Sequence, residues 1–188
     1  RYSYDGDNRL LTAETSTDKV IWDVDQENTY NSVGTMNRKL TGQDRVQGTD
    51  YVSTIQGWLK GINHASLSTE KDPGQDGFAN TVGEDAFGMI LNYYDGDYRR
   101  TSGIGTAYTN NDEQHLAGTH DLFNGNISSW ASRIPDQTTG GTDIEHAGNV
   151  TGFKYRYDEL QRIKSADFYT LDADDATASW IGTDDYHT

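Results

Sequence analysis

Residues 153–163 read Phe153-Lys154-Tyr155-Arg156-Tyr157-Asp158-Glu159-Leu160-Gln161-Arg162-Ile163. Side chains along a strand point to alternating faces, so Tyr155 and Tyr157 share one face. Asp158 ends the strand, because its carboxylate can accept hydrogen bonds from turn amides. Arg162 begins the return strand, where it can pair with Asp158 across the hairpin. The stretch therefore predicts an antiparallel β-hairpin.

A near copy of this stretch opens the chain as Tyr2-Ser3-Tyr4-Asp5-Gly6-Asp7-Asn8-Arg9-Leu10. Both stretches read Tyr-x-Tyr-Asp, then a short turn, then Arg and an aliphatic residue. A degraded copy is expected at residues 30–40. One copy would be an ordinary hairpin, but copies at both ends of the chain predict a sheet built from one repeated unit.

The composition favours a folded all-β protein with an acidic surface. The chain has 188 residues, 15 Lys and Arg against 30 Asp and Glu, and a net charge of −15, which argues against a nucleic acid or an anionic membrane as partner. Hydrophobic residues make up only 33%, but 12 Tyr, 4 Trp and 5 Phe oppose disorder. Without Cys, there are no disulfides or thiolate metal sites.

The N-terminal sequence shows no signal peptide, and no run of 18 apolar residues predicts a membrane span. Because Arg1 lies inside a repeat, we expect the natural N-terminus to be missing. The repeat sheet is expected to cover residues 1–170, with loop excursions near 64–84 and 99–121. Residues 171–188 are interpreted as a frayed end or the start of the next unit.

Three further segments have strand or hairpin patterns. Val20-Ile21-Trp22-Asp23-Val24-Asp25 is expected to be a strand with Trp22 buried, and residues 57–61 a strand bracketed by glycines. Residues 122–130 are expected to form a hairpin, with Asn124-Gly125 as its type I′ turn. No segment has a sustained helical period.

Candidate metal sites are weak in the sequence. Asp5, Asp7 and Asn8 invite a calcium interpretation, but Asp and Asn are ordinary turn residues, which is the favoured role. In the segment that begins at Asp23, the twelfth position of a calcium loop is Gly34, which cannot bind an ion. That segment is interpreted as a charged strand end.

Catalytic signals are equally weak. His115 and His120 lie five residues apart beside Asp121, too loosely for a zinc site, and are interpreted as surface histidines. Carboxylates are so frequent that any pair carries little information, and no Gly-x-Ser-x-Gly or phosphate-binding glycine loop is present. We therefore expect no catalytic residues, no metal ligands, no cofactor and no enzyme activity.

The chain resembles the YD-repeat, or Rhs-repeat, superfamily, and in particular the large Rhs-type proteins of Bacteroidetes-like bacteria. The two Tyr-Asp hairpins carry the resemblance, together with Gln56-Gly57-Trp58-Leu59-Lys60-Gly61-Ile62-Asn63. It implies a curved sheet of consecutive antiparallel hairpins that spirals into a hollow shell around a C-terminal toxin or other cargo, in a secreted or cell-surface bacterial protein. Shells of this kind often contain a self-cleaving Asp-Pro motif, but Asp72-Pro73 lacks the surrounding pattern, so we expect no autoproteolysis.

This chain is too short to close such a shell, so the resemblance implies a structural segment. Its partners would be the remainder of its own polypeptide or neighbouring subunits at both sheet edges, with an enclosed toxin domain as a further partner. The residues expected to form the structural repeat motif are Tyr4, Asp5, Gly6, Arg9, Gly57, Trp58, Gly61, Tyr155, Tyr157, Asp158 and Arg162.

Two other functions stay open. The main alternative is an extracellular adhesive or carbohydrate-binding module, in which exposed rings stack on sugars; Trp58 and Trp130 are the candidate glycan contacts, with Tyr93, Tyr94 and Tyr155 as further candidates. The competing interpretation is that these rings fill the packed face of the sheet, because aromatic side chains dominate buried area in such chains. The third possibility is an enzyme with its site on one of the two loop excursions.

Overall fold

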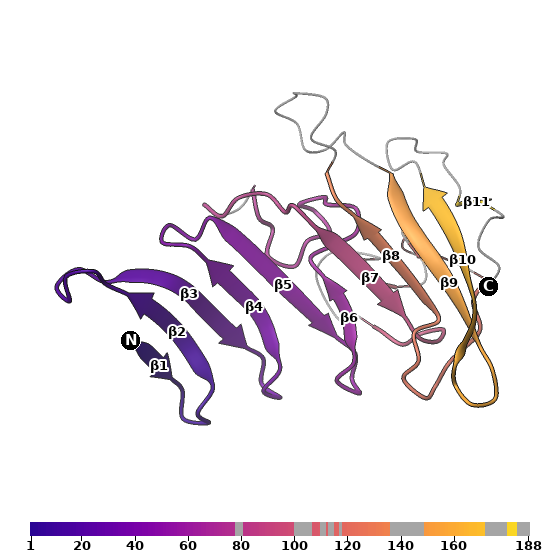
Figure 1. Cartoon of the computed structure of the whole chain (residues 1–188), viewed down its shortest axis with the longest axis horizontal. Helices are drawn as coiled ribbons and strands as arrows, with labels where there is room; N and C mark the ends of the chain where they lie inside the picture. The colour runs from indigo at the N-terminus through magenta and orange to yellow at the C-terminus, as the bar shows by residue number, and fades with distance from the viewer. Residues whose placement is uncertain are drawn as a thin grey trace.

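The computed structural model describes residues 1–77, 81–99, 107–109, 112, 115–116, 118–135, 149–171 and 180–183. Within these residues the protein is all-β and contains no helix, which confirms the predicted fold class. Eleven antiparallel strands form one open, curved sheet whose strand order is the order of the chain (Figure 1). Accordingly, no helix long and apolar enough to span a membrane occurs in the described part of the chain.

The strands are joined mostly by short turns in the first half and by longer loops in the second. Their bounds are β1 Tyr2–Tyr4, β2 Leu10–Thr15, β3 Asp23–Tyr30, β4 Met36–Thr41, β5 Gln47–Ser53, β6 Leu59–Ile62, β7 Gly88–Asn92, β8 Ser129–Arg133, β9 Val150–Tyr157, β10 Ile163–Leu171 and β11 Ile181–Thr183. Each strand contacts only its neighbours in the sequence. The sheet therefore grows by repetition rather than by crossing connections.

Four hairpins, β1–β2, β3–β4, β5–β6 and β9–β10, close through the same five-residue turn. The turns begin at Asp5, Asn31, Thr54 and Asp158. In each turn, the first carbonyl accepts a hydrogen bond from the fourth amide, and the first amide donates to the fifth carbonyl. The first side chain also accepts a hydrogen bond from the fifth amide. One hydrogen-bonding pattern thus recurs with Asp, Asn or Thr in the first position.

The fourth residue of every such turn has a left-handed backbone. The φ angles are 62° at Asn8, 88° at Gly34, 84° at Gly57 and 61° at Gln161. Gly and Asn adopt this conformation readily, whereas Gln does so only at a cost. The turn geometry therefore dictates the two glycines and makes Gln161 the strained member.

A β-bulge follows each of the four turns. One extra residue on the outgoing strand, namely Leu11, Asn37, Lys60 or Lys164, lies opposite no partner. A bulge bends its strand and increases the local twist. Repeated at the same place in each hairpin, it accounts for the continuous curvature of the sheet in Figure 1.

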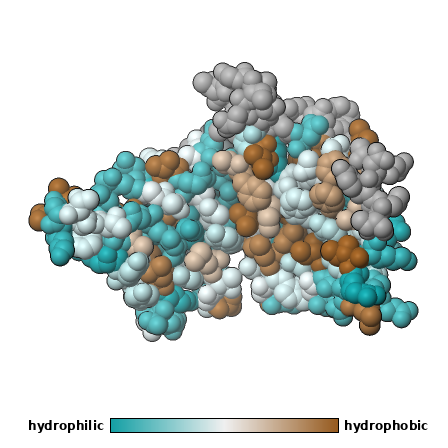
Figure 2. Space-filling model, in the orientation of Figure 1, coloured by the Kyte–Doolittle hydropathy of each residue, from teal (hydrophilic) through white to brown (hydrophobic). Residues whose placement is uncertain are grey.

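The buried core lies beneath β5–β10. It contains Val52, Ala65, Ile90, Ala107, Tyr108, Ala131, Val150 and Leu171. The ring of Tyr108 lies so close over Gly61 that a Cβ there would collide with it. Figure 2 shows hydrophobic residues gathered over the middle and the C-terminal half of the sheet, while the surface over β1–β4 is mainly hydrophilic.

Three predicted segments differ from the structure. Val20 and Ile21 are 80% and 69% exposed, because Asp18 accepts hydrogen bonds from both amides and holds a turn, so β3 begins only at Asp23. Trp22 was predicted to be buried but is half-buried, with the guanidinium of Arg1 4.8 Å from its ring centre.

The predicted hairpin at residues 122–130 is also wrong. Gly125 has a positive φ, but Asn124 does not, and a type I′ turn requires both. The Asn124 side chain instead accepts a hydrogen bond from the Asn126 amide, and β8 pairs with β7 and β9. Gly57 and Trp58 likewise belong to a turn, since β6 begins at Leu59. Most of residues 171–188 lie outside the described residues, which include β11.

Candidate functional site

The interior of the described chain is unusually polar. Buried polar and charged residues outnumber buried hydrophobic ones among the described residues, and they lie both on the strands and in the loops that cover the sheet. Buried charges are costly unless they are paired and hydrogen-bonded. Each buried charged group therefore requires a partner, and three separate networks can be followed.

The first network is a group of four carboxylates, here called the acidic cluster, consisting of Asp50, Asp72, Asp76 and Asp85. Asp50 lies on β5, and the other three lie on the loop between β6 and β7. Each of the four residues is at most 5% exposed. One carboxylate oxygen from each of Asp50, Asp72 and Asp76 lies within 4.8 Å of the others.

A compact loop brings Asp72 and Asp76 together. The Asp72 amide donates to the carbonyl of Ser68, and Pro73 then fixes the backbone for a turn in which the Gln75 amide donates to the Asp72 carbonyl. The Asp76 amide donates to Asp72 Oδ2 over 3.3 Å. The two carboxylates are thereby held by local backbone geometry.

Two glycines let this loop approach the sheet. A Cβ at Gly74 would overlap the guanidinium of Arg38 and the carboxylate of Asp50. A Cβ at Gly48 on β5 would overlap the carboxylate of Asp76. Only glycine fits at these two positions, because the charged groups occupy the space that a Cβ atom would need.

Arg38 is the cation paired with the acidic cluster in the described structure. It lies on β4 directly opposite Asp50 in the register, and its guanidinium forms ion pairs with both Asp50 and Asp76. Four carboxylates and one guanidinium give a formal charge of −4 + 1 = −3 when all are ionised. The cluster therefore carries more negative charge than its own cation neutralises.

Burial, and after it the surplus negative charge, shifts the pKa values of the carboxyl groups. Burial, and then the charges of Asp72, Asp76 and Asp50, raise the pKa of Asp85 to about 8. Burial and the charge of Asp72 raise the pKa of Asp50 to about 6, although Arg38 opposes this. Burial also raises the pKa of Asp72. The cluster thus favours a bound proton or a bound cation at neutral pH.

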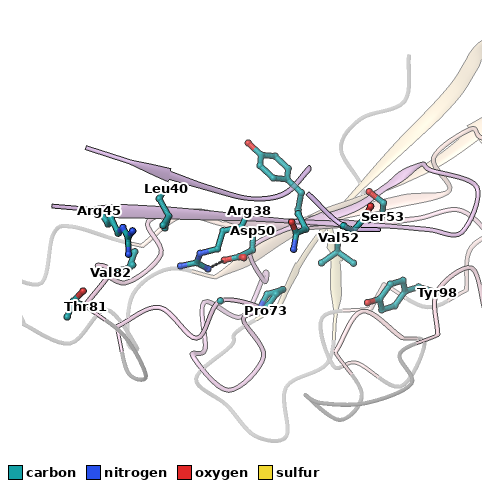
Figure 3. Close-up of a pocket in the computed structure, with 14 residues that line it drawn as sticks. Arg38, Leu40, Arg45, Asp50, Val52, Ser53, Pro73, Thr81, Val82 and Tyr98 are labelled. Carbon is teal, nitrogen blue, oxygen red and sulfur yellow. Dashed lines mark hydrogen bonds and ion pairs between the residues drawn. The ribbon is translucent and has the colours of Figure 1, made fainter. Parts of the chain in front are cut away.

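A groove of about 710 Å³ opens beside the acidic cluster. Its lining includes Arg38, Asp50, Pro73, Gly74 and Tyr98. Figure 3 shows the Arg38–Asp50 pair below the sheet, between the strands and the loop that carries Pro73. The groove provides a route for water and small ions to the edge of the cluster.

The second network surrounds Lys60, the extra residue of the β5–β6 bulge. Its fully buried ammonium donates to Asn92 Oδ1 at 2.8 Å and to Asp97 Oδ1 at 2.7 Å. Burial lowers the pKa of Lys60, while the Asp97 carboxylate opposes that change. His115 Nδ1 lies 3.1 Å from Asn92 Oδ1, so this histidine is half-buried and not the surface residue that was predicted. His120 is exposed as predicted.

The third network contains a serine, a histidine and an aspartate. His64 Nε2 lies 2.7 Å from Asp112 Oδ2, and Nδ1 lies 2.7 Å from Ser66 Oγ. His64 Nδ1 also accepts a hydrogen bond from the Ser66 amide, and the Arg133 guanidinium donates one to the Ser66 carbonyl. The side chains of His64 and Asp112 are wholly buried while Ser66 is half-buried, so their contacts hold the covering loop in place.

The predicted repeat residues lie in the turns and strands of three hairpins, and Tyr157, Asp158 and Arg162 also line a surface hollow of about 660 Å³ beside the β9–β10 turn. Arg9 Nε donates to Asp5 Oδ2 at 2.6 Å, and Arg162 Nε donates to Asp158 Oδ2 at 2.7 Å. The Arg162 amide and guanidinium lower the pKa of Asp158. Tyr4 is 53% exposed on the edge strand, and nothing lies within 4 Å of a Cβ built at Gly6.

The aromatic candidates contact one another. Trp58 packs against Tyr93 with ring centres 5.0 Å apart, and Trp130 stacks on Phe153 at 5.6 Å. Tyr155 also stacks on Phe153, with ring centres 6.3 Å apart. Trp58 and Trp130 are half-buried and lie on separate parts of the sheet, so they do not form one platform.

Sequence reasoning missed the acidic cluster. The sequence feature that could have indicated it is the compact segment Asp72-Pro73-Gly74-Gln75-Asp76-Gly77, which lies within the predicted loop excursion near residues 64–84. No protein-family model matches the chain, and no curated protein matches it either.

Proposed function

We propose that the chain is a structural segment of a larger β-shell of the YD-repeat, or Rhs, type. In this role the sheet walls off or presents a cargo, such as a C-terminal toxin domain, in a secreted or cell-surface bacterial protein. The chain itself contributes rigid curvature and catalyses nothing.

One observation carries the proposal: the sheet is open, and its strands follow one another in chain order with a repeated hairpin and bulge. Among the described residues, β1 and β11 each have one partner strand only. An open sheet edge offers unpaired amides and carbonyls to another strand. The remainder of the polypeptide, or a neighbouring subunit, is the natural occupant of both edges.

The Arg1 carbonyl accepts the Glu14 amide, and bonded positions alternate along an antiparallel strand, so the amide of Tyr2 points away from β2. Hydrogen–deuterium exchange of the native full-length protein should show protection at Tyr2 that the isolated 188-residue chain lacks. Tyr2→Pro removes the donor and should weaken assembly, whereas Tyr2→Thr keeps the donor and serves as the control. Equal exchange in both forms, or unchanged assembly of Tyr2→Pro, contradicts the proposal.

A protease test addresses the cargo separately. If the shell encloses a toxin domain, that domain should resist protease in the intact protein and become sensitive once the shell is opened by denaturant. A cargo that is cleaved at the same rate in both states argues for a surface scaffold instead.

A further inference from the structure

The acidic cluster contains carboxylate oxygens that the protein itself does not satisfy. In the described structure, Oδ1 of Asp72 and Oδ1 of Asp85 are buried and receive no hydrogen bond. Asp72 is 2% exposed and Asp85 is 5% exposed, and their carboxyl groups adjoin each other. Two adjoining buried carboxylates require a proton or a cation between them.

The oxygens lie close enough together to share one cation. Ca²⁺ binds oxygen at about 2.4 Å, so two ligand atoms on opposite sides of the ion lie about 4.8 Å apart. The oxygens from Asp50, Asp72 and Asp76 all lie within 4.8 Å of one another. This spacing leaves room for one ion shared by the three carboxylates. Mg²⁺ binds at about 2.1 Å and keeps several waters, which makes it the poorer match.

The chemical type of the ligand atoms also favours Ca²⁺. All three groups are carboxylates, which suit hard cations such as Ca²⁺ rather than zinc or copper. The half-buried Asp5 provides a contrast, because its carboxylate already accepts hydrogen bonds from the amides of Asp7 and Arg9 and from the Arg9 guanidinium. An acidic turn of that kind has no orphaned oxygen, whereas the buried cluster has two.

We propose that Asp50, Asp72 and Asp76 bind one Ca²⁺ ion, with Asp85 as a fourth carboxylate beside it. The ion joins the 63–87 loop to β5, next to the ion pairs that Arg38 makes with Asp50 and Asp76. Waters from the adjoining groove complete the coordination. This inference is independent of the proposed shell function.

The test uses the 188-residue chain, stripped with EDTA and titrated with CaCl₂ in a calorimeter. We expect about one Ca²⁺ per chain, a Kd of about 1–100 μM and a binding at least tenfold weaker for MgCl₂. Tb³⁺ should bind the same site and show emission sensitised by Tyr98 or Tyr51, which line the groove. Ca²⁺ should quench that emission by competition.

Asp72→Asn provides the decisive variant, with the exposed Asp44→Asn as matched control. Asp72→Asn should lose at least tenfold in Ca²⁺ affinity. It should also unfold at a higher temperature than the unchanged chain in EDTA, since it relieves repulsion, and at a lower temperature in saturating Ca²⁺. Asp44→Asn should change neither measurement.

Several results would overturn the site. These are no saturable binding up to 1 mM Ca²⁺, full affinity in Asp72→Asn, or the same order of unfolding temperatures with and without Ca²⁺. If Asp72→Asn does not fold, Asp76→Asn and Asp85→Asn are measured in its place. Full Ca²⁺ affinity in both of those variants also rejects the site.

Discussion

Arg38 on β4 and Asp50 on β5 are opposite each other in the register and form an ion pair, and the same guanidinium also binds Asp76 of the covering loop. One side chain thereby joins two strands and the loop that packs beneath them. The Asp76 side chain is fully buried and that of Arg38 is 16% exposed, so little solvent screens these contacts.

Replacing Arg38 with Met should destabilise the protein strongly. The change leaves buried carboxylates without their cation, a loss of about 3–5 kcal/mol for a buried pair. Urea denaturation monitored by tryptophan fluorescence measures it. Arg162→Met, which removes a turn ion pair whose arginine side chain is 72% exposed, is the control and should cost much less. Equal losses for the two variants would show that the Arg38 contacts contribute no more than a surface pair.

Gly74→Ala should disturb the same place by steric overlap. The new methyl group would occupy the space of the Arg38 guanidinium and the Asp50 carboxylate, for a cost of about 1–3 kcal/mol. Gly6→Ala is the matched control, because no atom lies within 4 Å of a Cβ built there. The two are compared by thermal unfolding, and an unchanged midpoint for Gly74→Ala would mean that the loop is not held against the sheet.

Stability of the calcium-free chain should fall as the pH rises from about 4 to about 8. Asp85, with its pKa raised to about 8, keeps a proton in the folded state that the unfolded chain, with an ordinary pKa of about 3.9, has released. The folded state then binds more protons, so the free energy of unfolding decreases with pH, by up to about 1.4 kcal/mol per pH unit for one proton.

Urea denaturation at pH 5.5 and pH 8, in EDTA, checks this slope. Asp85→Asn removes the titrating group and should flatten the dependence, while the general repulsion among the other acidic groups remains. A slope that is the same in both proteins would place its origin outside the acidic cluster.

Gln161→Gly should stabilise the β9–β10 hairpin. Gln161 has a φ of 61° at a position where two of the four equivalent turns have Gly. Glycine removes the cost of the left-handed backbone, and this gain exceeds the loss caused by the greater freedom of the unfolded chain. The free energy of unfolding should therefore rise by about 0.5 kcal/mol. The neighbouring Leu160→Gly relieves no such strain and should destabilise. Thermal unfolding of both variants tests the pair, and a loss of stability in Gln161→Gly contradicts the turn geometry.

The hairpins could be predicted from sequence because their information is local. Asp5 and Asp158, the residues that follow them, and the alternating tyrosines all act within a few positions. The bulges could not be predicted, since no single residue type marks the extra positions Leu11, Asn37, Lys60 and Lys164. The burial of Trp22 was predicted wrongly because Asp18 accepts hydrogen bonds from the two preceding amides and forms a turn. The alternation of hydrophobic residues gives no sign of this turn.

The acidic cluster could not be predicted for a different reason. Asp50 and Asp85 are far apart in the sequence, and only the folded loop brings them together with Asp72 and Asp76. In a chain with 30 acidic residues, an aspartate carries little information until its burial is known. The informative signs were the small residues Gly48 and Gly74, which make room for charged groups, and no spacing rule identifies them.

Neighbour-only pairing has a mechanical consequence. Pulled from its N-terminal end, such a sheet should peel one strand at a time, since removing β1 leaves the contacts of β3 intact. The force needed to remove a strand should rise where Arg38 joins the loop of residues 63–87 to β4 and β5. A sheet that unfolds one strand at a time can pass through a narrow pore as an extended chain. The ion pairs of Arg38 mark the step at which this unfolding should be slowest.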